Sequence, residues 1–134
     1  MRKRIYSGAP LEKKVGYCRA TRVGDLVFVS GSTTAIKDGQ VVGVGDPAAQ
    51  TRQIVATIEK ALREAGSSMD EVVRYRLFVT NAEDFPAVMK VLSETFGGIH
   101  PCGTGVVVTA LVHPEFVVEI EVDAVIGSAT PVES

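Results

Sequence analysis

Residues 118–124 constrain the fold most, because aliphatic and acidic side chains alternate along the whole segment. Successive side chains of a β-strand point to opposite faces of a sheet, so this pattern predicts a strand with one face in a core and one face outside it. The aliphatic face holds Val118, Ile120, Val122 and Ala124, and the acidic face holds Glu119, Glu121 and Asp123. We expect this last strand to span residues 117–126.

A second strand with two different faces is predicted over residues 72–80. One face carries Val73, Tyr75, Leu77 and Val79, and the other carries Arg74, Arg76 and Phe78. If both aliphatic faces pack under the same helices, the two arginines meet the acidic residues across strands on an open face. Such a face suits a subunit interface with embedded ion pairs, so we expect a homo-oligomer. The alternative is a solvated sheet face with weak salt bridges at its rim.

Two helices are predicted to cover the aliphatic face. The first begins at Asp46-Pro47, because Asp caps free backbone N–H groups and Pro suits the first helical position, and Gly66 follows its end. The second spans residues 85–96 and stops at Gly97-Gly98. Their apolar stripes are Ile54, Val55, Ile58, Ala61, Leu62 and Ala65, and Val88, Val91, Leu92 and Phe96.

The whole chain is predicted to form one α+β domain, residues 1–134, with a mixed sheet and two helices packed on one face. Its 134 residues, 46% of them hydrophobic, suit a single core. Further extended segments are expected at 15–22, 26–30, 41–42 and 105–111, whereas residues 1–14 are expected to be irregular and 127–134 loose.

The charge balance excludes several classes of partner. The net charge is −2, from 14 basic and 16 acidic side chains, which gives no electrostatic basis for binding nucleic acid or an anionic membrane. Cys18 and Cys102 are isolated thiols, which is typical of a reduced, cytoplasmic protein. His100 and His113 lack the spacing of metal ligands, so we expect neither a metal nor another cofactor.

Three segments contain candidate functional residues, each with a structural alternative. Ser30-Gly31 is either a turn at a strand end or a set of backbone N–H groups that holds an anion. The small residues Cys102, Gly103 and Thr104 either connect two elements or let a ligand approach the backbone closely. Glu119 is either a general base or part of a structural ion pair, and Cys102 is either reactive or inert.

Taken in order, a set of short motifs resembles the reactive intermediate deaminase family, of the RidA or YjgF type, formerly known as endoribonuclease L-PSP. The resemblance covers about residues 15–126. It is carried by Gly16-Tyr17, residues 24–31, residues 50–53, Ala65-Gly66, Val72-Val73-Arg74, Phe78-Val79-Thr80, Asp84-Phe85, Phe96, Pro101 and Val118-Glu119-Ile120-Glu121.

The resemblance implies a chorismate-mutase-like fold and a homotrimer with a central β-barrel and small-molecule clefts between subunits. It also implies that Glu119 orients a water molecule and that Tyr17 and Ser30-Gly31 line the cleft. In deaminating members, the arginine of a Pro-x-Arg motif binds the substrate carboxylate. Here that motif is Pro101-Cys102-Gly103, so glycine stands at the arginine position.

Arg19 is a candidate for the missing anion anchor, because an extended chain places it on the same face as Tyr17. The alternative is an ordinary surface or interface arginine. Two functions follow from these residues: hydrolysis of a reactive imine or enamine to a keto product and ammonia, or binding of a small metabolite without chemistry. A substrate lacking a carboxylate is a variant of the second, and a ribonuclease role has no support from the charge balance.

Overall fold

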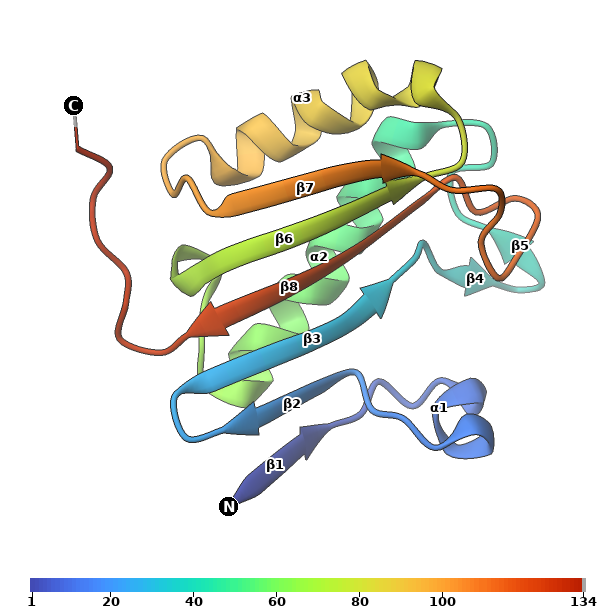
Figure 1. Ribbon diagram of the computed structural model, residues 1–134. Helices are drawn as coiled ribbons and strands as arrows, with labels where there is room; N and C mark the ends of the chain where they lie inside the picture. Colours follow the sequence, from blue (N-terminus) through green and yellow to red (C-terminus); the bar gives the residue numbers. More distant parts are fainter. Residues whose placement is uncertain (134) are drawn as a thin grey trace.

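The fold is built on a six-stranded mixed sheet with the strand order β1-β2-β3-β8-β6-β7, seen face-on in the computed structural model of Figure 1, which describes residues 1–133. Only β6 and β7 pair in parallel; the other neighbours are antiparallel. The strands are β1 (Arg2–Ile5), β2 (Ala20–Val23), β3 (Leu26–Ser32), β6 (Val72–Val79), β7 (Cys102–Val107) and β8 (Val118–Val125).

Two helices, α2 (Pro47–Ala65) and α3 (Phe85–Phe96), pack on the same face of this sheet, as predicted. The opposite face turns toward the viewer in Figure 1 and carries no helix of the described residues. Side chains of both helices and of the sheet form one buried cluster; the strands contribute Val27, Val29, Leu77, Val79, Val118, Ile120, Val122 and Ala124. The alternation along residues 118–124 is therefore confirmed, since the aliphatic side chains are buried and the acidic ones are not.

The ends of α2 follow the capping chemistry that the sequence predicts. The Asp46 carboxylate accepts a hydrogen bond from the Ala49 N–H at 3.0 Å, and Pro47 occupies the first helical position. At the other end Gly66 has φ of 90°, the left-handed conformation that favours glycine. The predicted bounds of α3 are also confirmed, and its apolar stripe of Val88, Val91, Leu92 and Phe96 is buried.

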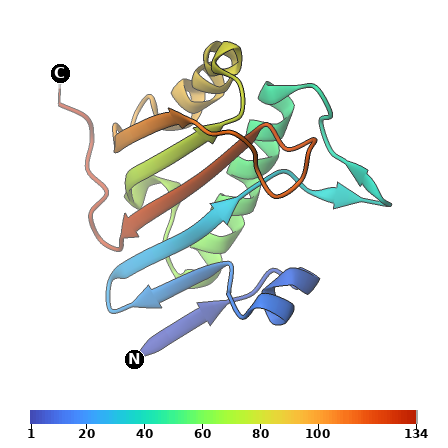
Figure 2. The same cartoon turned by 45° about the vertical axis from the view of Figure 1, so that its right-hand side comes forward.

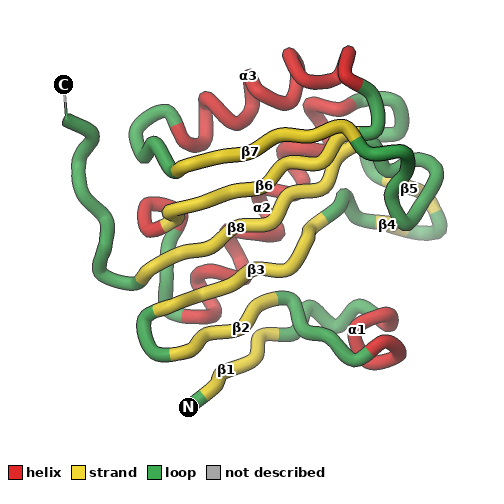
Figure 3. Tube along the Cα trace, in the orientation of Figure 1, coloured by secondary structure: helices red, strands yellow, loops and turns green. Residues whose placement is uncertain are grey.

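The amino-terminal segment differs from the prediction of an irregular stretch over residues 1–14. It forms β1, which pairs with β2, and the short helix α1 (Pro10–Val15), which lies beyond the carboxyl end of β1 (Figure 3). Only Ile5 of the four residues of β1 is buried, so the segment lacks the alternation of hydrophobic residues that would predict a strand. The extended segment expected at 15–22 is shortened accordingly, because α1 runs to Val15 and β2 begins at Ala20.

Two other strands are displaced from their predicted positions. β7 spans Cys102–Val107 instead of 105–111, because its parallel pairing with β6 starts at Cys102 opposite Arg74. In β6 the register shifts between Val72 and Arg74, so Val72 is buried and Val73 is exposed, whereas the prediction placed Val73 on the core face. A β-bulge of this kind adds a residue that simple alternation does not anticipate.

Two small features complete the chain. The strand expected at 41–42 is β5 (Gln40–Val41), which pairs with β4 (Ile36–Lys37) in a separate hairpin that projects from one side of the molecule (Figure 2). A loose tail is predicted over residues 127–134; residues 127–133 form neither helix nor strand, and residue 134 lies outside the described part. Within residues 1–133, no helix has the length and hydropathy that a membrane crossing requires.

A fully buried glutamine ties the start of α2 to the segment that leads into β8. The Gln50 Nε2 donates to the carbonyls of Gly43 and Glu115, and its Oε1 accepts from the Val117 N–H at 3.0 Å. Without Gln50, the two carbonyls and the Val117 N–H would each lose this hydrogen-bond partner. Because Val117 precedes Glu119 by two residues, Gln50 fixes the entry of the strand that carries the main candidate residue.

Candidate functional site

The open face of the sheet is both charged and apolar. The Arg76 Nη1 lies 3.2 Å from the Glu121 carboxylate and 3.5 Å from that of Asp123, across the β6–β8 pair. Around this pair, exposed hydrophobic side chains continue over neighbouring strands: Val23, Leu26, Phe28, Val73 and Val106. The predicted ion pairing is thus present for Arg76 with Glu121 and Asp123, whereas Arg74 and Glu119 form no ion pair among residues 1–133. An exposed apolar rim surrounds the Arg76 cluster.

Glu119 stands apart from that ion-pair cluster, near the amino end of β8. Its carboxylate lies against the backbone of Gly31 in β3, where a Cβ atom would come within 2.3 Å of Oε2. Burial raises the pKa of the Glu119 carboxyl, repulsion by Glu121 raises it further, and the positive charge of Arg19 opposes both. A half-buried carboxyl with a raised pKa has the properties of a general base.

Arg19 lies beside Glu119 and completes this cluster. Its Nη2 donates to the Gly31 carbonyl at 2.9 Å, and its guanidinium carbon is 5.9 Å from the centre of the Tyr17 ring. The Nε of Arg19 is buried and has no hydrogen-bond partner among the described residues. The Nη2 bond to the Gly31 carbonyl holds the guanidinium in one orientation, and an oriented guanidinium is suited to bind an anion.

The loop before β2 holds these groups in place through Ser30. The Ser30 Oγ donates to the Cys18 carbonyl at 2.7 Å, and its N–H donates to the Arg19 carbonyl. The pairing of β3 with β8 shifts register between Val29 and Ser32, which aims Gly31 at Glu119. The structure therefore brings together five predicted site residues: Tyr17, Arg19, Ser30, Gly31 and Glu119.

The other three predicted site residues, Cys102, Gly103 and Thr104, lie elsewhere in the same chain. They begin the edge strand β7, where Cys102 and Thr104 are level with Asp123 and Glu121 of β8, two strands away. Strand geometry puts them roughly 12 to 16 Å from Glu119. The Cys102 Sγ donates to the Val73 carbonyl at 3.1 Å. One chain by itself does not unite the two groups.

Gly103 faces the helix-covered side of the sheet. A Cβ atom there would lie 2.3 Å from Cζ of Tyr75 and 2.6 Å from its hydroxyl oxygen. The Tyr75 ring in turn stacks on Phe96 of α3, with 5.4 Å between ring centres. Tyr75 thus fills the space over Gly103, a relation that sequence reasoning missed because parallel pairing of β6 with β7 is not readable from either segment alone.

The chemistry open to the cluster around Glu119 follows from the side chains it contains. Among residues 1–133, no group of three or more His, Cys, Asp or Glu side chains is arranged to hold a metal ion. The cluster offers a carboxylate that can accept a proton, a guanidinium that can bind an anion, and an aromatic ring. These groups suit the addition of water to a small, polarised substrate.

Comparison with known proteins identifies relatives over nearly the whole chain. Residues 8–126 match the family described as Endoribonuclease L-PSP. The chain is 35% identical over 126 residues to an uncharacterized protein of Streptomyces coelicolor, covering 94% of this chain and 93% of that protein. It is 38% identical over 104 residues to the 3-aminoacrylate deaminase RutC of Acinetobacter baylyi, covering 78% of this chain and 82% of that protein.

Solved structures agree with these relatives. A member of the YjgF/YER057c/UK114 family from Mycobacterium tuberculosis superposes with a TM-score of 0.85 at 42% identity, over 94% of this chain and all of that chain (100%). The Rid-family protein YyfA from Yersinia pestis superposes with a TM-score of 0.80 at 28% identity, over 94% and 100% of the two chains.

Proposed function

Because this chain belongs to the Endoribonuclease L-PSP family, also known as the RidA or YjgF family, we propose that it hydrolyses a reactive imine or enamine to a keto product and ammonia. The deaminase RutC, at 38% identity, supports this reaction class. The observation that carries the proposal is the half-buried Glu119 carboxylate, which lies against Gly31 and beside Arg19.

In the proposed reaction, the Glu119 carboxylate accepts a proton from water as the water oxygen attacks the imine carbon. The proton held by Glu119 passes to the nitrogen, which gives a carbinolamine with one hydroxyl and one amino group. Glu119 then accepts the hydroxyl proton as the carbonyl forms and returns it to the nitrogen, and the carbon–nitrogen bond breaks to release ammonia. An enamine substrate is first protonated on carbon to give the imine. Imine and water are thereby converted to the keto product and ammonia, and Glu119 returns to its starting state.

Arg19 is proposed to bind the negative group of the substrate. Its orientation, held by the Gly31 carbonyl, and its position beside Tyr17 and Glu119 support this role over that of an ordinary surface arginine. The role matters because glycine occupies position 103, so that β7 offers no guanidinium. A charge-assisted hydrogen bond of roughly 1.5–3 kcal/mol corresponds to a ten- to hundredfold gain in binding.

The site is proposed to be completed between subunits of a homotrimer whose open sheet faces form a central β-barrel. The exposed apolar rim, with Leu26 and Phe28 each 45% exposed, supports burial of this face by another copy. The separation of Cys102, Gly103 and Thr104 from Glu119 supports a cleft to which the β7 edge of a neighbouring subunit contributes. Sedimentation equilibrium tests the assembly: a monomer at micromolar concentration contradicts it.

A second function, binding a small metabolite without chemistry or hydrolysing a substrate without a carboxylate, is favoured by one observation. Tyr75 occupies the space over Gly103, so the β7 strand contributes no anion-binding side chain at that position. A coupled assay separates the two functions: a dehydratase generates 2-aminoacrylate or 2-iminobutanoate, and release of the keto acid is followed with and without the protein. A deaminating relative is the positive control.

A further inference from the structure

A cavity of about 1010 Å³ opens between β1, α1 and the loop that leads to β2. Its volume is at the upper end of the range found for organic ligands. All lining residues lie within residues 2–21, where the chain runs from β1 through α1 and back to β2, which pairs with β1. Cys18 and Thr21 form the side nearest the centre of the sheet.

Two of the cations in this cavity, Arg2 and Arg4, point into it because side chains alternate along β1. Residues 2, 4 and 6 follow one another on one side of β1 and its extension, and all three line the cavity. The intervening residues point the other way: Ile5 is buried in the core, and the Lys3 Nζ donates to the Glu64 carbonyl of α2 at 2.8 Å. Arg2 and Arg4 are thereby directed away from the helices, and Lys13 of α1 joins them.

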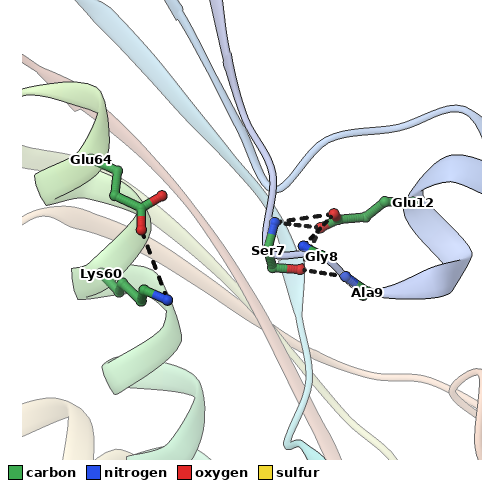
Figure 4. A network of polar contacts seen from close by, with 6 residues as sticks. All are labelled: Ser7, Gly8, Ala9, Glu12, Lys60 and Glu64. Carbon is green, nitrogen blue, oxygen red and sulfur yellow. Dashed lines mark hydrogen bonds and ion pairs between the residues drawn. The ribbon is translucent and has the colours of Figure 1, made fainter.

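The one acidic lining residue of the cavity, Glu12, is not paired with any of its three cations. Glu12 is buried and turned toward the preceding turn, where its carboxylate accepts hydrogen bonds from the Ser7 N–H and hydroxyl and the Gly8 N–H (Figure 4). Among residues 1–133, no carboxylate lies within 4.0 Å of the charged nitrogens of Arg2, Arg4 or Lys13. Three cations therefore share a concave surface with one carboxylate, that of Glu12, which forms an ion pair with none of them.

Two aromatic rings, those of Tyr6 and Tyr17, line the same cavity and give it an apolar component. Tyrosine presents a flat apolar surface and a polar tip, which suits an organic ligand better than a bare ion. We propose that this cavity binds a small organic anion, with Arg2, Arg4 and Lys13 around its negative group and with Tyr6 and Tyr17 against its body.

This anion site is separate from the cluster around Glu119, although Tyr17 borders both. Glu119, Gly31 and Ser30 do not line the cavity. Binding there requires no catalysis, so the proposal stands or falls independently of imine hydrolysis. The Glu119→Gln substitution is expected to leave binding of an anion in the cavity unchanged.

Titration calorimetry of the full chain tests the proposal with phenyl phosphate, benzoate, benzyl alcohol and inorganic phosphate as probes. We expect saturable binding of phenyl phosphate or benzoate, weakened by added salt, and weaker binding of both the neutral alcohol and the bare ion. The two aromatic anions distinguish a phosphate from a carboxylate as the preferred group. Arg4→Gln is expected to weaken binding about tenfold.

The matched control is Arg52→Gln, which removes the same charge from an exposed arginine on α2, outside the cavity. Circular dichroism verifies that both variants are folded. The proposal is overturned if neither aromatic anion binds saturably, if benzyl alcohol binds as tightly as the anions, or if Arg52→Gln weakens binding as much as Arg4→Gln.

Discussion

The carboxylate of Glu119 lies so close to Gly31 that a Cβ atom at position 31 would come within 2.3 Å of its Oε2 and 3.0 Å of its Cδ. The two residues belong to β8 and β3, which meet beside a register shift that turns Gly31 toward the acid. Glycine at position 31 therefore sets where the carboxylate stands, and through it where an attacking water is held in the proposed reaction.

Gly31→Ala is expected to reduce hydrolysis at least tenfold while changing the free energy of unfolding by less than about 1 kcal/mol. The added methyl group meets only the far end of a flexible side chain, so the fold accommodates it when the carboxylate moves. Steady-state kinetics and urea unfolding measure the two effects. Gly98→Ala, at a position with open space around it, is the control. Unchanged activity in Gly31→Ala contradicts the assigned geometry.

Gly103→Ala is expected to destabilise the protein by about 1–3 kcal/mol, because the new methyl group meets the Tyr75 ring stacked on Phe96. In a Tyr75→Leu background the same substitution is expected to cost less, which urea unfolding of the four variants detects as a coupling energy. It follows that Gly103→Arg is also expected to lower the stability of the folded protein. Equal costs in both backgrounds contradict the contact.

Gln50→Met is expected to destabilise the protein by about 3 kcal/mol, because three backbone groups lose their hydrogen-bond partner in a buried position. The loss also frees the segment before Glu119. Gln53→Met on the same helix is the control: among residues 1–133 the Gln53 side chain forms no hydrogen bond, and only its backbone carbonyl accepts one, from Thr57. Thermal unfolding of both variants tests the role of Gln50. Similar unfolding midpoints for the two variants contradict it.

The layered fold was predictable because its signals are local. Alternation along residues 118–124 and the stripes of α2 and α3 each specify a buried face within one segment. The bulge at Val73, the start of β7 and the first strand were not predictable in the same way. Those features depend on pairing with distant strands, and a four-residue strand with one buried side chain contains little periodicity.

For the candidate site, too, the sequence predicted the features that depend on a single segment and missed those that depend on pairing between segments. The strand pattern placed Glu119 on the open face and Arg19 on the same face as Tyr17, and both positions agree with the structure. No pattern indicated that Tyr75 covers Gly103, or that Arg2, Arg4 and Tyr6 share a cavity with α1. Those relations arise from parallel pairing and from the packing of a short helix, which a single segment does not specify.

The raised pKa of Glu119 predicts a pH dependence of activity. A general base must be unprotonated, so kcat/KM is expected to fall as the pH drops through the raised pKa of this carboxyl. Arg19→Gln removes a positive charge that lowers this pKa, and therefore shifts the acid limb of the profile to higher pH. Glu121→Gln removes a repulsion and shifts it to lower pH. Profiles that coincide in all three proteins contradict the assignment.

The same pKa predicts a change in stability. Its value is higher in the folded protein than the ordinary 4.5, so the folded state binds more protons than the unfolded state between the two values. The contribution of Glu119 to stability is therefore lost as the pH rises through that window. At pH 7, Glu119→Gln is expected to be at least as stable as the natural protein in urea, with the difference shrinking toward pH 4.5. Lower stability of the variant at pH 7 contradicts this.

The central claim, that Glu119 activates water for imine hydrolysis, is tested most directly by keto-acid release from 2-iminobutanoate generated in place by a dehydratase. We expect the natural protein to accelerate release over the uncatalysed rate, and Glu119→Gln, folded to the same extent, to lose about 10²- to 10⁴-fold of kcat/KM. No acceleration by the natural protein, beside an active deaminating relative, or full activity in Glu119→Gln contradicts the account.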